Sequence, residues 1–331
     1  MKASVIGAGS WGSAFARYLG RIKVPTELWV REEDIGKDLL KHRENRTFLP
    51  GYTFPSTVTF SNNIKESVLF GDILFIAVPS QYCRSVYAMI APYLQAGQTV
   101  VSLTKGIDQK TLKRMSQVME EVFRSHARPH IAVLSGPSFA RDVAAGHPTA
   151  LVVASHDFET ARTIQHLLSS LTIRVYTSSD VTGVEIAGAL KNVIAIAAGI
   201  ADAMDFGLNS RAALITRGLV EITRVGLALG AQKKTFSGLA GIGDLVLTCT
   251  GELSRNHYVG YQLGKGKSLE AILSHMKMVA EGVHTTNSAR RLAKAQGVEM
   301  PIANQIYQVL YRNKAPRKAL EELMTRALRE E

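Results

Sequence analysis

Cysteine is nearly absent from this chain of 331 residues, which contains only Cys83 and Cys249. Two widely separated cysteines are too few for a disulfide framework or a four-ligand zinc site, so we expect reduced thiols and no metal. No run of eighteen or more apolar residues occurs, and the N-terminus leaves no room for a cleavable leader. We therefore expect a cytoplasmic protein without stable membrane insertion.

The chain is basic, but its Lys and Arg residues are not gathered in a single block. Its 39 Lys and Arg residues outnumber 28 Asp and Glu residues, which gives a formal net charge of +11. Such a field attracts anions, whether nucleic acid, anionic membrane or small phosphorylated ligands. Zinc-finger spacing, basic-zipper repeats and RNP-type aromatic motifs do not occur, so we expect no nucleic-acid partner. Solvated surface is a sufficient explanation for most of these charges.

The first half alternates short β-branched runs with longer amphipathic stretches, which is typical of βαβ units around a parallel sheet. The expected strands are Ala3–Ile6, Glu27–Val30, Asp72–Val78, Thr99–Leu103, Ile131–Leu134, Leu151–Ala154 and Arg174–Tyr176. The expected helices are Trp11–Gly20, Tyr82–Tyr93, Leu112–Arg124 and a segment near Glu159–Ser169. Residues 72–78 are apolar on both alternating faces, as in a strand covered by helices on both sides.

From about Val181 the chain changes to long segments rich in Ala, Leu and Ile. The clearest helix is Asp180–Ala203, with Asp180 as its expected N-cap. Further helices are expected near Ser210–Leu229, Thr285–Ala295, Ile302–Tyr311 and Pro316–Leu328. We therefore expect a mostly parallel Rossmann-type dinucleotide-binding domain over residues 1–180 and an all-helical domain over residues 181–331, each with its own core.

A glycine-rich turn directly follows the first strand and opens the first helix. Gly7, Gly9 and Gly12 fit the pattern G-x-G-x-x-G, with Ser10 and Trp11 between them. The first glycine permits a tight turn, the second lets a pyrophosphate approach the backbone, and the third lets helix and strand pack closely. Since the helix N-terminus then faces the phosphates, this context predicts dinucleotide binding.

Arg31 follows the second strand, where an acidic residue usually hydrogen-bonds the ribose 2′-hydroxyl of NAD. An arginine there can pair instead with the 2′-phosphate of NADP, while the adjacent Glu32 can still serve NAD. The alternative is an ordinary solvated arginine. We predict a preference for NADP(H) with some use of NAD(H).

Several blocks together resemble the bacterial NAD(P)-dependent glycerol-3-phosphate dehydrogenases over nearly the whole chain. They are Gly7–Gly12, Ala77–Gln81, Thr104–Ile107, Ser135–Ala140, Lys191–Val193, Gly238–Leu245, Ser254–Asn256 and Val279–Gly282. The resemblance implies a Rossmann domain, a helical domain like that of 6-phosphogluconate dehydrogenase, an active site in the cleft between them and a homodimer. It also implies hydride transfer between NAD(P)H and C2 of dihydroxyacetone phosphate, which supplies glycerol 3-phosphate for glycerophospholipid synthesis.

Reduction of a ketone leaves negative charge on its oxygen, so a proton donor must stand there and take the proton back in the reverse direction. Lys191 lies in an apolar helix, where desolvation lowers the pKa of a lysine toward the working pH. The resemblance makes it the family's proton acceptor. The alternative is a lysine whose stem merely covers the helix surface.

The remaining site residues rest largely on the resemblance. Lys105, just after the expected strand Thr99–Leu103, is implied to contact substrate and cofactor, although it also fits a surface turn. Gly136 and Ser138 are implied for substrate oxygens and Ala140 for the cofactor. Asp244 is implied at the substrate site, where a carboxylate can hold the Lys191 ammonium, bind a substrate hydroxyl or cap the helix that begins near Leu245.

The triplet Ser254, Arg255 and Asn256 offers a hydroxyl, a bidentate guanidinium and an amide, which suit a phosphate. Arg255 is implied to touch the cofactor as well, together with Val279 and Glu281. Cys249 is expected to be a small packing residue because hydride transfer needs no covalent intermediate. Two rivals remain: a two-domain reductase of a non-phosphorylated hydroxyacid, and a non-enzymatic dinucleotide sensor.

Overall fold

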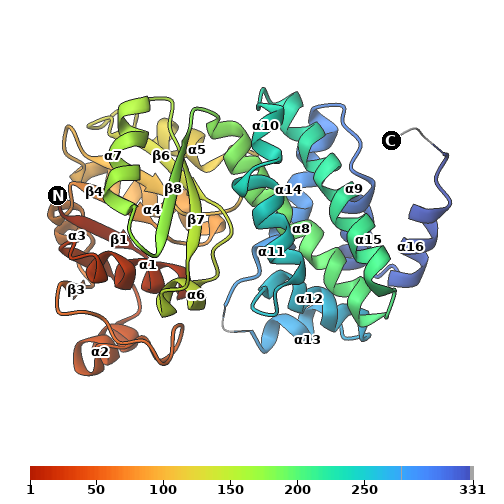
Figure 1. The fold of residues 1–331 in the computed structure, drawn as a ribbon, viewed down its shortest axis with the longest axis horizontal. Helices are drawn as coiled ribbons and strands as arrows, with labels where there is room; N and C mark the ends of the chain where they lie inside the picture. The colour runs from red at the N-terminus through yellow and green to blue at the C-terminus, as the bar shows by residue number, and fades with distance from the viewer. Residues whose placement is uncertain (277, 329–331) are drawn as a thin grey trace. The chain divides into compact units, whose positions relative to one another are not determined.

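The computed structural model describes residues 1–276 and 278–328 (Figure 1). The chain divides into two compact units. The first unit comprises Met1–Asp108 and Lys113–Glu185, and the second comprises Gln109–Leu112 and the described residues from Ile186 onward. The division after Glu185 falls inside one long helix, five residues beyond the expected domain boundary.

In the described residues of the first unit, eight strands form one sheet in the order β3-β2-β1-β4-β5-β6-β7-β8. All neighbouring pairs are parallel except β6 and β7. The strands are β1 (Ala3–Ile6), β2 (Thr26–Trp29), β3 (Val58–Ser61), β4 (Ile73–Ile76), β5 (Thr99–Ser102), β6 (His130–Ser135), β7 (Thr149–Ala154) and β8 (Ile173–Ser178). This arrangement confirms the predicted Rossmann-type, mostly parallel sheet.

Helices cover both faces of this sheet (Figure 1). The helices of this unit are α1 (Ser10–Arg21), α2 (Glu33–His42), α3 (Ile64–Phe70), α4 (Ser80–Ile90), η1 (Ala91–Tyr93), α5 (Met115–Phe123), α6 (Ala140–Ala145) and α7 (Phe158–Leu168). One core packs α1 and α7 against the sheet, and the other packs α3, α4 and α5. On β4, Phe75 faces the first core and Leu74 the second, which confirms that this strand is buried on both faces.

From the sequence, one strand of this unit was missed and the start of one helix was placed wrongly. Strand β3 was missed, because its four residues Val58–Ser61 carry no extended apolar run. The helix expected from Leu112 begins only at Met115, because Leu112 has a left-handed backbone with φ of 60°. Glu185 then accepts hydrogen bonds from the N–H and hydroxyl of Ser116 at 2.8 and 2.6 Å, which satisfies the start of α5.

The second unit is helical throughout its regular elements, as predicted. Its helices are α8 (Val181–Ala203), which starts in the first unit, α9 (Gly207–Ala228), α10 (Lys233–Phe236), η2 (Leu239–Gly243), α11 (Asp244–Thr250), α12 (Arg255–Gly264), α13 (Leu269–Ser274), α14 (Glu281–Ala295), α15 (Pro301–Arg312) and α16 (Pro316–Met324). Asp180 caps α8 by accepting from Gly183 N–H at 2.9 Å, which confirms that expectation. By length and composition α8 is long and apolar enough to cross a membrane, but 94% of that stretch is buried within the protein.

Glycines let two helices, α12 and α14, approach α8 at backbone distance. A Cβ on Gly199 would lie 2.0 Å from the carbonyl oxygen of His257, and one on Gly260 would lie 2.0 Å from that of Ile196. A Cβ on Gly282 would lie 2.5 Å from the carbonyl oxygen of Asn192. The backbones of α12 and α14 therefore touch α8 next to Lys191, the residue assigned to proton transfer.

Glu221, on α9, is a buried carboxylate that caps another helix. It is 3% exposed and accepts hydrogen bonds from the N–H groups of Ile302 and Ala303 at 2.7 and 3.3 Å. These are orphan donors in the first turn of α15, whose N-cap Met300 has no side chain able to accept them. Burial raises the pKa of Glu221 to about 7, although the two backbone donors oppose the shift.

We expect Glu221 to make stability depend on pH in a defined direction. The folded state holds this proton more tightly than the unfolded chain, where the pKa is 4.5, so stability falls as pH rises from 4.5 to 7. The loss is about 3 kcal/mol. Glu221→Gln keeps an accepting oxygen but does not titrate. The urea concentration at its unfolding midpoint should therefore rise relative to that of the parent as the pH increases from 5 to 8. A difference between the two proteins that stays constant over this range would contradict the assignment.

Candidate active site

The glycine-rich turn lies at the switch point of the sheet, where the strand order reverses between β1 and β4. Gly7 has φ of 114°, and a Cβ there would lie 2.8 Å from the carbonyl oxygen of Ala77. A Cβ on Gly12 would lie 1.9 Å from the carbonyl oxygen of Gly7, whereas one on Gly9 would meet no atom within 4 Å. The first and third glycines are thus required by packing, and the second leaves room for a ligand at the start of α1.

Asn45 stabilises this turn by hydrogen bonds, and it was not predicted as a site residue. The side chain is fully buried, and its Nδ2 donates to the carbonyl oxygen of Ala8 and to Ser13 Oγ, both at 2.8 Å. The neighbouring Ser10 hydroxyl donates to the carbonyl oxygen of Phe48. Trp11 packs with its ring centroid 5.7 Å from that of Phe15. The side chains of Ser10 and Trp11 therefore shape the turn, and their backbone N–H groups lie in the first turn of α1.

Arg31 lies two residues beyond the end of β2 and is exposed. Its Nε donates to Glu32 Oε1 at 3.0 Å, and its guanidinium lies 5.8 Å from the ring centroid of Tyr82. Aromatic stacking of this kind fixes the plane of a guanidinium while leaving donors for an anion. The structure thus places an oriented arginine after β2.

Three of the implied substrate residues lie together where β5 and β6 end. Lys105 Nζ donates to the carbonyl oxygen of Gly136 at 2.8 Å, and the Ser138 hydroxyl donates to the same oxygen at 3.0 Å. Gly136 has φ of 128°, and a Cβ there would lie 3.1 Å from the carbonyl oxygen of Ala150. Ala140 follows as the first residue of α6. The carboxyl ends of parallel strands thus collect these groups at one edge of the sheet.

Two buried polar atoms at this edge have no hydrogen-bond partner among residues 1–276 and 278–328. They are Gln81 Oε1, in the first turn of α4 after β4, and Ser135 Oγ, at the end of β6. Orphaned polar atoms are costly and concentrate where a ligand completes the hydrogen bonds. Gln81 was not predicted as a site residue, although it ends the block Ala77–Gln81 that carries part of the resemblance.

In the second unit Lys191 is 5% exposed and is held by two groups of α11. Its Nζ donates to Asp244 Oδ1 and, at 2.7 Å, to Thr248 Oγ1. The Thr248 hydroxyl donates its own proton to the carbonyl oxygen of Asp244 at 2.6 Å, so it can only accept from the lysine. A buried ammonium with a carboxylate partner is stabilised in its charged form. Thr248 was missed because a lone threonine carries no sequence signal.

The structure favours one of the roles left open for Asp244, the contact with the Lys191 ammonium. The residue is 1% exposed, and α11 begins at Asp244 itself with Gly243 as its N-cap. Its side chain turns to Lys191 instead of capping the helix. The N-cap alternative was therefore wrong, because the pull of a buried ammonium exceeds that of a backbone N–H.

In the triplet Ser254, Arg255 and Asn256, the first and third residues support the helices, whereas the second is exposed. The Ser254 hydroxyl caps α12 by accepting from His257 N–H at 3.2 Å. The Asn256 amide is 7% exposed; its Nδ2 donates to Asn192 Oδ1, and its Oδ1 accepts from Gly282 N–H, both at 2.9 Å. Asn256 thus ties α8, α12 and α14 together beside Lys191.

Arg255 is the exposed member of the triplet. Its Nη1 donates to the carbonyl oxygen of Val279 at 2.8 Å. Burial of the guanidinium lowers the pKa of Arg255, and the charge of Glu281 opposes this shift. Val279 and Glu281, which the resemblance implies as cofactor contacts, thus interact with Arg255. A guanidinium held by one nitrogen still presents further donors in a planar fork.

Asp202 was also missed by the sequence analysis. Its carboxylate oxygens lie 2.6 Å from His257 Nε2 and 2.8 Å from Arg211 Nε, from which Asp202 accepts hydrogen bonds. These bonds connect the first turn of α12 to α8 and α9.

Cys249 lies nearby and is fully buried, and burial raises its pKa to about 12. Its burial supports the interpretation of Cys249 as a packing residue, because reactive cysteines are partly exposed and have a lowered pKa. The described ranges contain no group of three or more His, Cys, Asp or Glu placed to hold a metal ion.

A doubly wound sheet with a glycine-rich turn at its switch point, followed by a helical unit with a buried lysine, defines the class of two-domain dinucleotide-binding oxidoreductases. The sequence profiles described as NAD-dependent glycerol-3-phosphate dehydrogenase N-terminus and C-terminus match residues 2–161 and 180–321. The chain belongs to this NAD-dependent glycerol-3-phosphate dehydrogenase family, which confirms the resemblance seen in the sequence.

Individual relatives agree with this assignment. The chain is 51% identical over 327 residues to a glycerol-3-phosphate dehydrogenase (NAD(P)+) from Geobacter sulfurreducens, covering 99% of this chain and 98% of that one. A crystal structure of glycerol-3-phosphate dehydrogenase from Coxiella burnetii matches with a TM-score of 0.94 and 36% identity, covering 98% of this chain and 99% of that one. A ketopantoate reductase from Ralstonia eutropha reaches a TM-score of 0.61 at 17% identity over 97% of this chain and all of that one, and it shares the fold alone.

Proposed function

We propose that this chain transfers a hydride between NAD(P)H and C2 of dihydroxyacetone phosphate, forming sn-glycerol 3-phosphate, and catalyses the reverse reaction. The observation that carries the proposal is the buried Lys191, held by Asp244 and Thr248, in a chain of the glycerol-3-phosphate dehydrogenase family. A buried, oriented ammonium is the proton donor that a forming alkoxide requires.

Lys191 would act at the C2 oxygen. In the reduction its ammonium donates a proton to that oxygen, and in the oxidation the neutral amine takes the proton back. The hydrogen bond to Asp244 holds Nζ in place, which supports Lys191 as the group that delivers the proton. The nicotinamide, when bound, supplies or accepts the hydride.

Arg255 would hold the phosphate, with the Ser254 hydroxyl and the Asn256 amide beside it. The guanidinium offers a charge-assisted fork, and its bond to Val279 fixes its direction. Asn256 keeps Arg255 close to Lys191 by joining α12 to α8. We assign Lys105, Gly136 and Ser138 of the first unit to the same substrate, with Lys105 adding positive charge near the alkoxide.

The glycine-rich turn would hold the cofactor pyrophosphate. Gly7, Gly9, Ser10, Trp11 and Gly12 provide the tight turn, the open approach at Gly9 and the N–H groups of α1. The unpartnered Gln81 Oε1 lies at the adjoining strand end, where the nicotinamide half of a dinucleotide belongs. We assign Lys105, Ala140, Arg255, Val279 and Glu281 as further cofactor contacts, as the resemblance implies.

We expect Arg31→Ala to weaken NADPH selectively. Loss of a charge-assisted contact to the 2′-phosphate should lower kcat/KM for NADPH about tenfold and leave the value for NADH nearly unchanged. Steady-state kinetics with both cofactors measure this, and Lys37→Ala, which removes another exposed cation of this unit, serves as the control. An unchanged kcat/KM with NADPH would show that Arg31 is a solvated arginine.

The proposed activity is tested by following NADPH absorbance with a panel of ketones. Dihydroxyacetone phosphate should be reduced efficiently, and dihydroxyacetone, which lacks the phosphate, should be turned over far more slowly. Faster turnover of an unphosphorylated 2-oxoacid would favour the rival hydroxyacid reductase. Absence of turnover with any ketone, despite NADPH binding, would favour the dinucleotide sensor.

Cellular context follows from the resemblance alone. We propose that the enzyme is a cytoplasmic homodimer that supplies glycerol 3-phosphate for glycerophospholipid synthesis. Sedimentation equilibrium at micromolar concentration tests the dimer, since a mass near the 36.0 kDa of one chain would contradict it.

A further inference from the structure

The segment that follows Lys105 is a closed loop anchored in the first unit. Ile107 forms an isolated antiparallel bridge with Arg114, and Asp108 N–H donates to the carbonyl oxygen of Lys113 at 3.0 Å. Gly106 lies between Lys105 and this closure. Glycine permits many backbone conformations. The position of Lys105 therefore depends on the contacts that hold the Ile107–Arg114 bridge in place.

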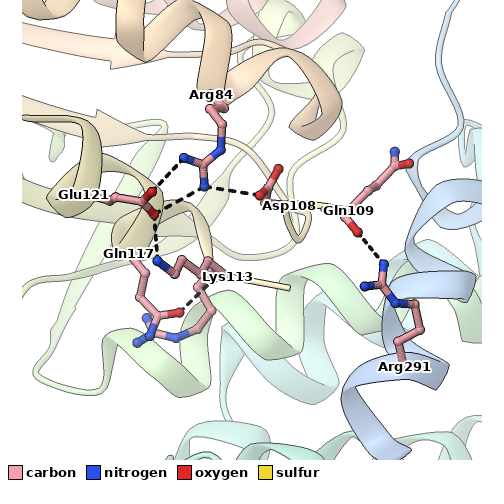
Figure 2. A network of polar contacts seen from close by, with 8 residues as sticks. Arg84, Asp108, Gln109, Lys113, Gln117, Glu121 and Arg291 are labelled. Carbon is pink, nitrogen blue, oxygen red and sulfur yellow. Dashed lines mark hydrogen bonds and ion pairs between the residues drawn. The ribbon is translucent and has the colours of Figure 1, made fainter. Parts of the chain in front are cut away.

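Asp108 is the inner anchor of this loop. Its side chain is 10% exposed, and its Oδ2 accepts from Arg84 Nη2 of α4 at 3.3 Å (Figure 2). A buried carboxylate without its cation would carry a large desolvation penalty, so the pair fixes the loop against α4. Helix α4 begins directly after β4, the neighbour of β5 in the sheet, and is therefore a rigid support for the chain that leaves β5.

Arg84 is itself held from the other side. Its Nη1 and Nη2 donate to the two carboxylate oxygens of Glu121 at 3.2 and 3.4 Å, and Lys113 Nζ donates to Glu121 Oε2 at 2.7 Å (Figure 2). The hydrogen bonds from Lys113 and Arg84 lower the pKa of Glu121 to about 2, so this carboxylate keeps its charge at every pH at which the enzyme would work. Asp108 and Lys113, at the two ends of the loop, are thus connected through the Arg84 guanidinium and the Glu121 carboxylate.

At the other side of the loop, Lys105 extends to the chain beyond β6, where its Nζ donates to the carbonyl oxygen of Gly136. A lysine has a long, flexible stem, so only a fixed backbone brings its ammonium to the same point in every molecule. Displacement of a substrate-binding group by about 1 Å costs about 10²-fold in rate. We therefore expect the ion pairs that hold this loop to affect the position of the Lys105 ammonium.

We propose that Asp108 and Arg84 are positioning residues that hold the Lys105 ammonium at the substrate. The proposal rests on the proposed function, in which Lys105 contacts dihydroxyacetone phosphate. Neither residue touches the substrate, so both act only through the loop and Lys105. Glu121 and Lys113 orient Arg84 from the solvent side and contribute less.

Kinetics of Asp108→Asn test the proposal. The variant keeps the shape of the side chain and loses its charge, and we expect kcat for dihydroxyacetone phosphate to fall about tenfold. The NADPH dissociation constant, measured by fluorescence titration, should change much less than kcat, because Lys105 is only one of several assigned cofactor contacts. Glu120→Gln, which removes a neighbouring exposed carboxylate of α5, should leave kcat unchanged. Equal kcat for the parent and Asp108→Asn would overturn the proposal.

A double-mutant cycle with Lys105→Met separates positioning from general damage. If Asp108 acts through Lys105, Asp108→Asn should change kcat less than twofold in the Lys105→Met background. Multiplicative effects of the two substitutions would overturn the proposal. Arg84→Lys provides a second route if Asp108→Asn does not fold: it keeps the charge, loses the fork, and should lower kcat severalfold in the parent but not in Lys105→Met.

Failure of the proposed function has a different signature in the same experiment. A parent enzyme that does not reduce dihydroxyacetone phosphate contradicts the activity itself. A normal kcat for Lys105→Met contradicts the role of Lys105, and the positioning proposal falls with it. A strong loss in Lys105→Met together with full activity in Asp108→Asn refutes the positioning proposal alone.

Discussion

Replacing Lys191 with alanine should lower kcat for dihydroxyacetone phosphate by about 10²- to 10⁴-fold, because the alkoxide loses its proton donor. The NADPH dissociation constant should stay within about twofold, since the assigned pyrophosphate site is on the first unit. Stopped-flow measurement of NADPH oxidation gives the chemical step directly. The expected loss is the largest of any substitution considered.

The substitution leaves Asp244 buried without its cation, which destabilises the fold as well. The double variant Lys191→Met with Asp244→Asn removes both charges and should fold better than Lys191→Ala while remaining inactive. Lys191→Arg keeps a positive charge but binds its proton too tightly to release it, so the oxidation of glycerol 3-phosphate should be lost. Substantial oxidation by the arginine variant would contradict proton transfer through this residue.

Arg255→Ala is expected to lower kcat/KM for dihydroxyacetone phosphate by about 10²- to 10³-fold, because the phosphate loses a bidentate charge-assisted contact. The loss should appear in kcat as well as in KM, since binding energy at the phosphate positions C2 for reaction. Arg290→Ala is a suitable control, because Arg290 is an exposed arginine of α14 that stacks on Tyr307, 4.5 Å from its ring centroid.

Unphosphorylated dihydroxyacetone distinguishes a phosphate anchor from general damage. If Arg255 binds the phosphate, the parent and Arg255→Ala should turn over this ketone at similar, low rates. A similar loss with and without the phosphate would show that Arg255 supports the cofactor or the fold instead. The substrate class would then need another anchor.

Those elements whose pattern lies within a few neighbouring residues were predicted correctly from the sequence. Residues 72–78 are apolar on both faces, and β4 is indeed buried between two helical layers. The glycines after β1 were read correctly because strand, turn and helix follow one another within a few residues. The cap at Asp180 was predictable for the same reason, since its donor is three residues away.

The contacts that give the site its chemistry join residues far apart in the sequence. Lys191 meets Asp244 across 53 residues, Asn192 meets Asn256 across 64, and Asn45 braces a turn 37 residues earlier. No periodicity encodes such a partner, so the sequence left three roles open for Asp244. Asn45 and Thr248 went unnoticed because each looks like an ordinary polar residue until the fold surrounds it.

A crystal structure of the enzyme with NADP+ and glycerol 3-phosphate tests the central claim most directly. We expect the C2 hydroxyl oxygen within about 3.2 Å of Lys191 Nζ and the phosphate oxygens on the guanidinium of Arg255. One ligand molecule that touches both side chains would support the assigned chemistry. A ligand bound by only one of the two, with the other facing a separate cavity, would contradict it.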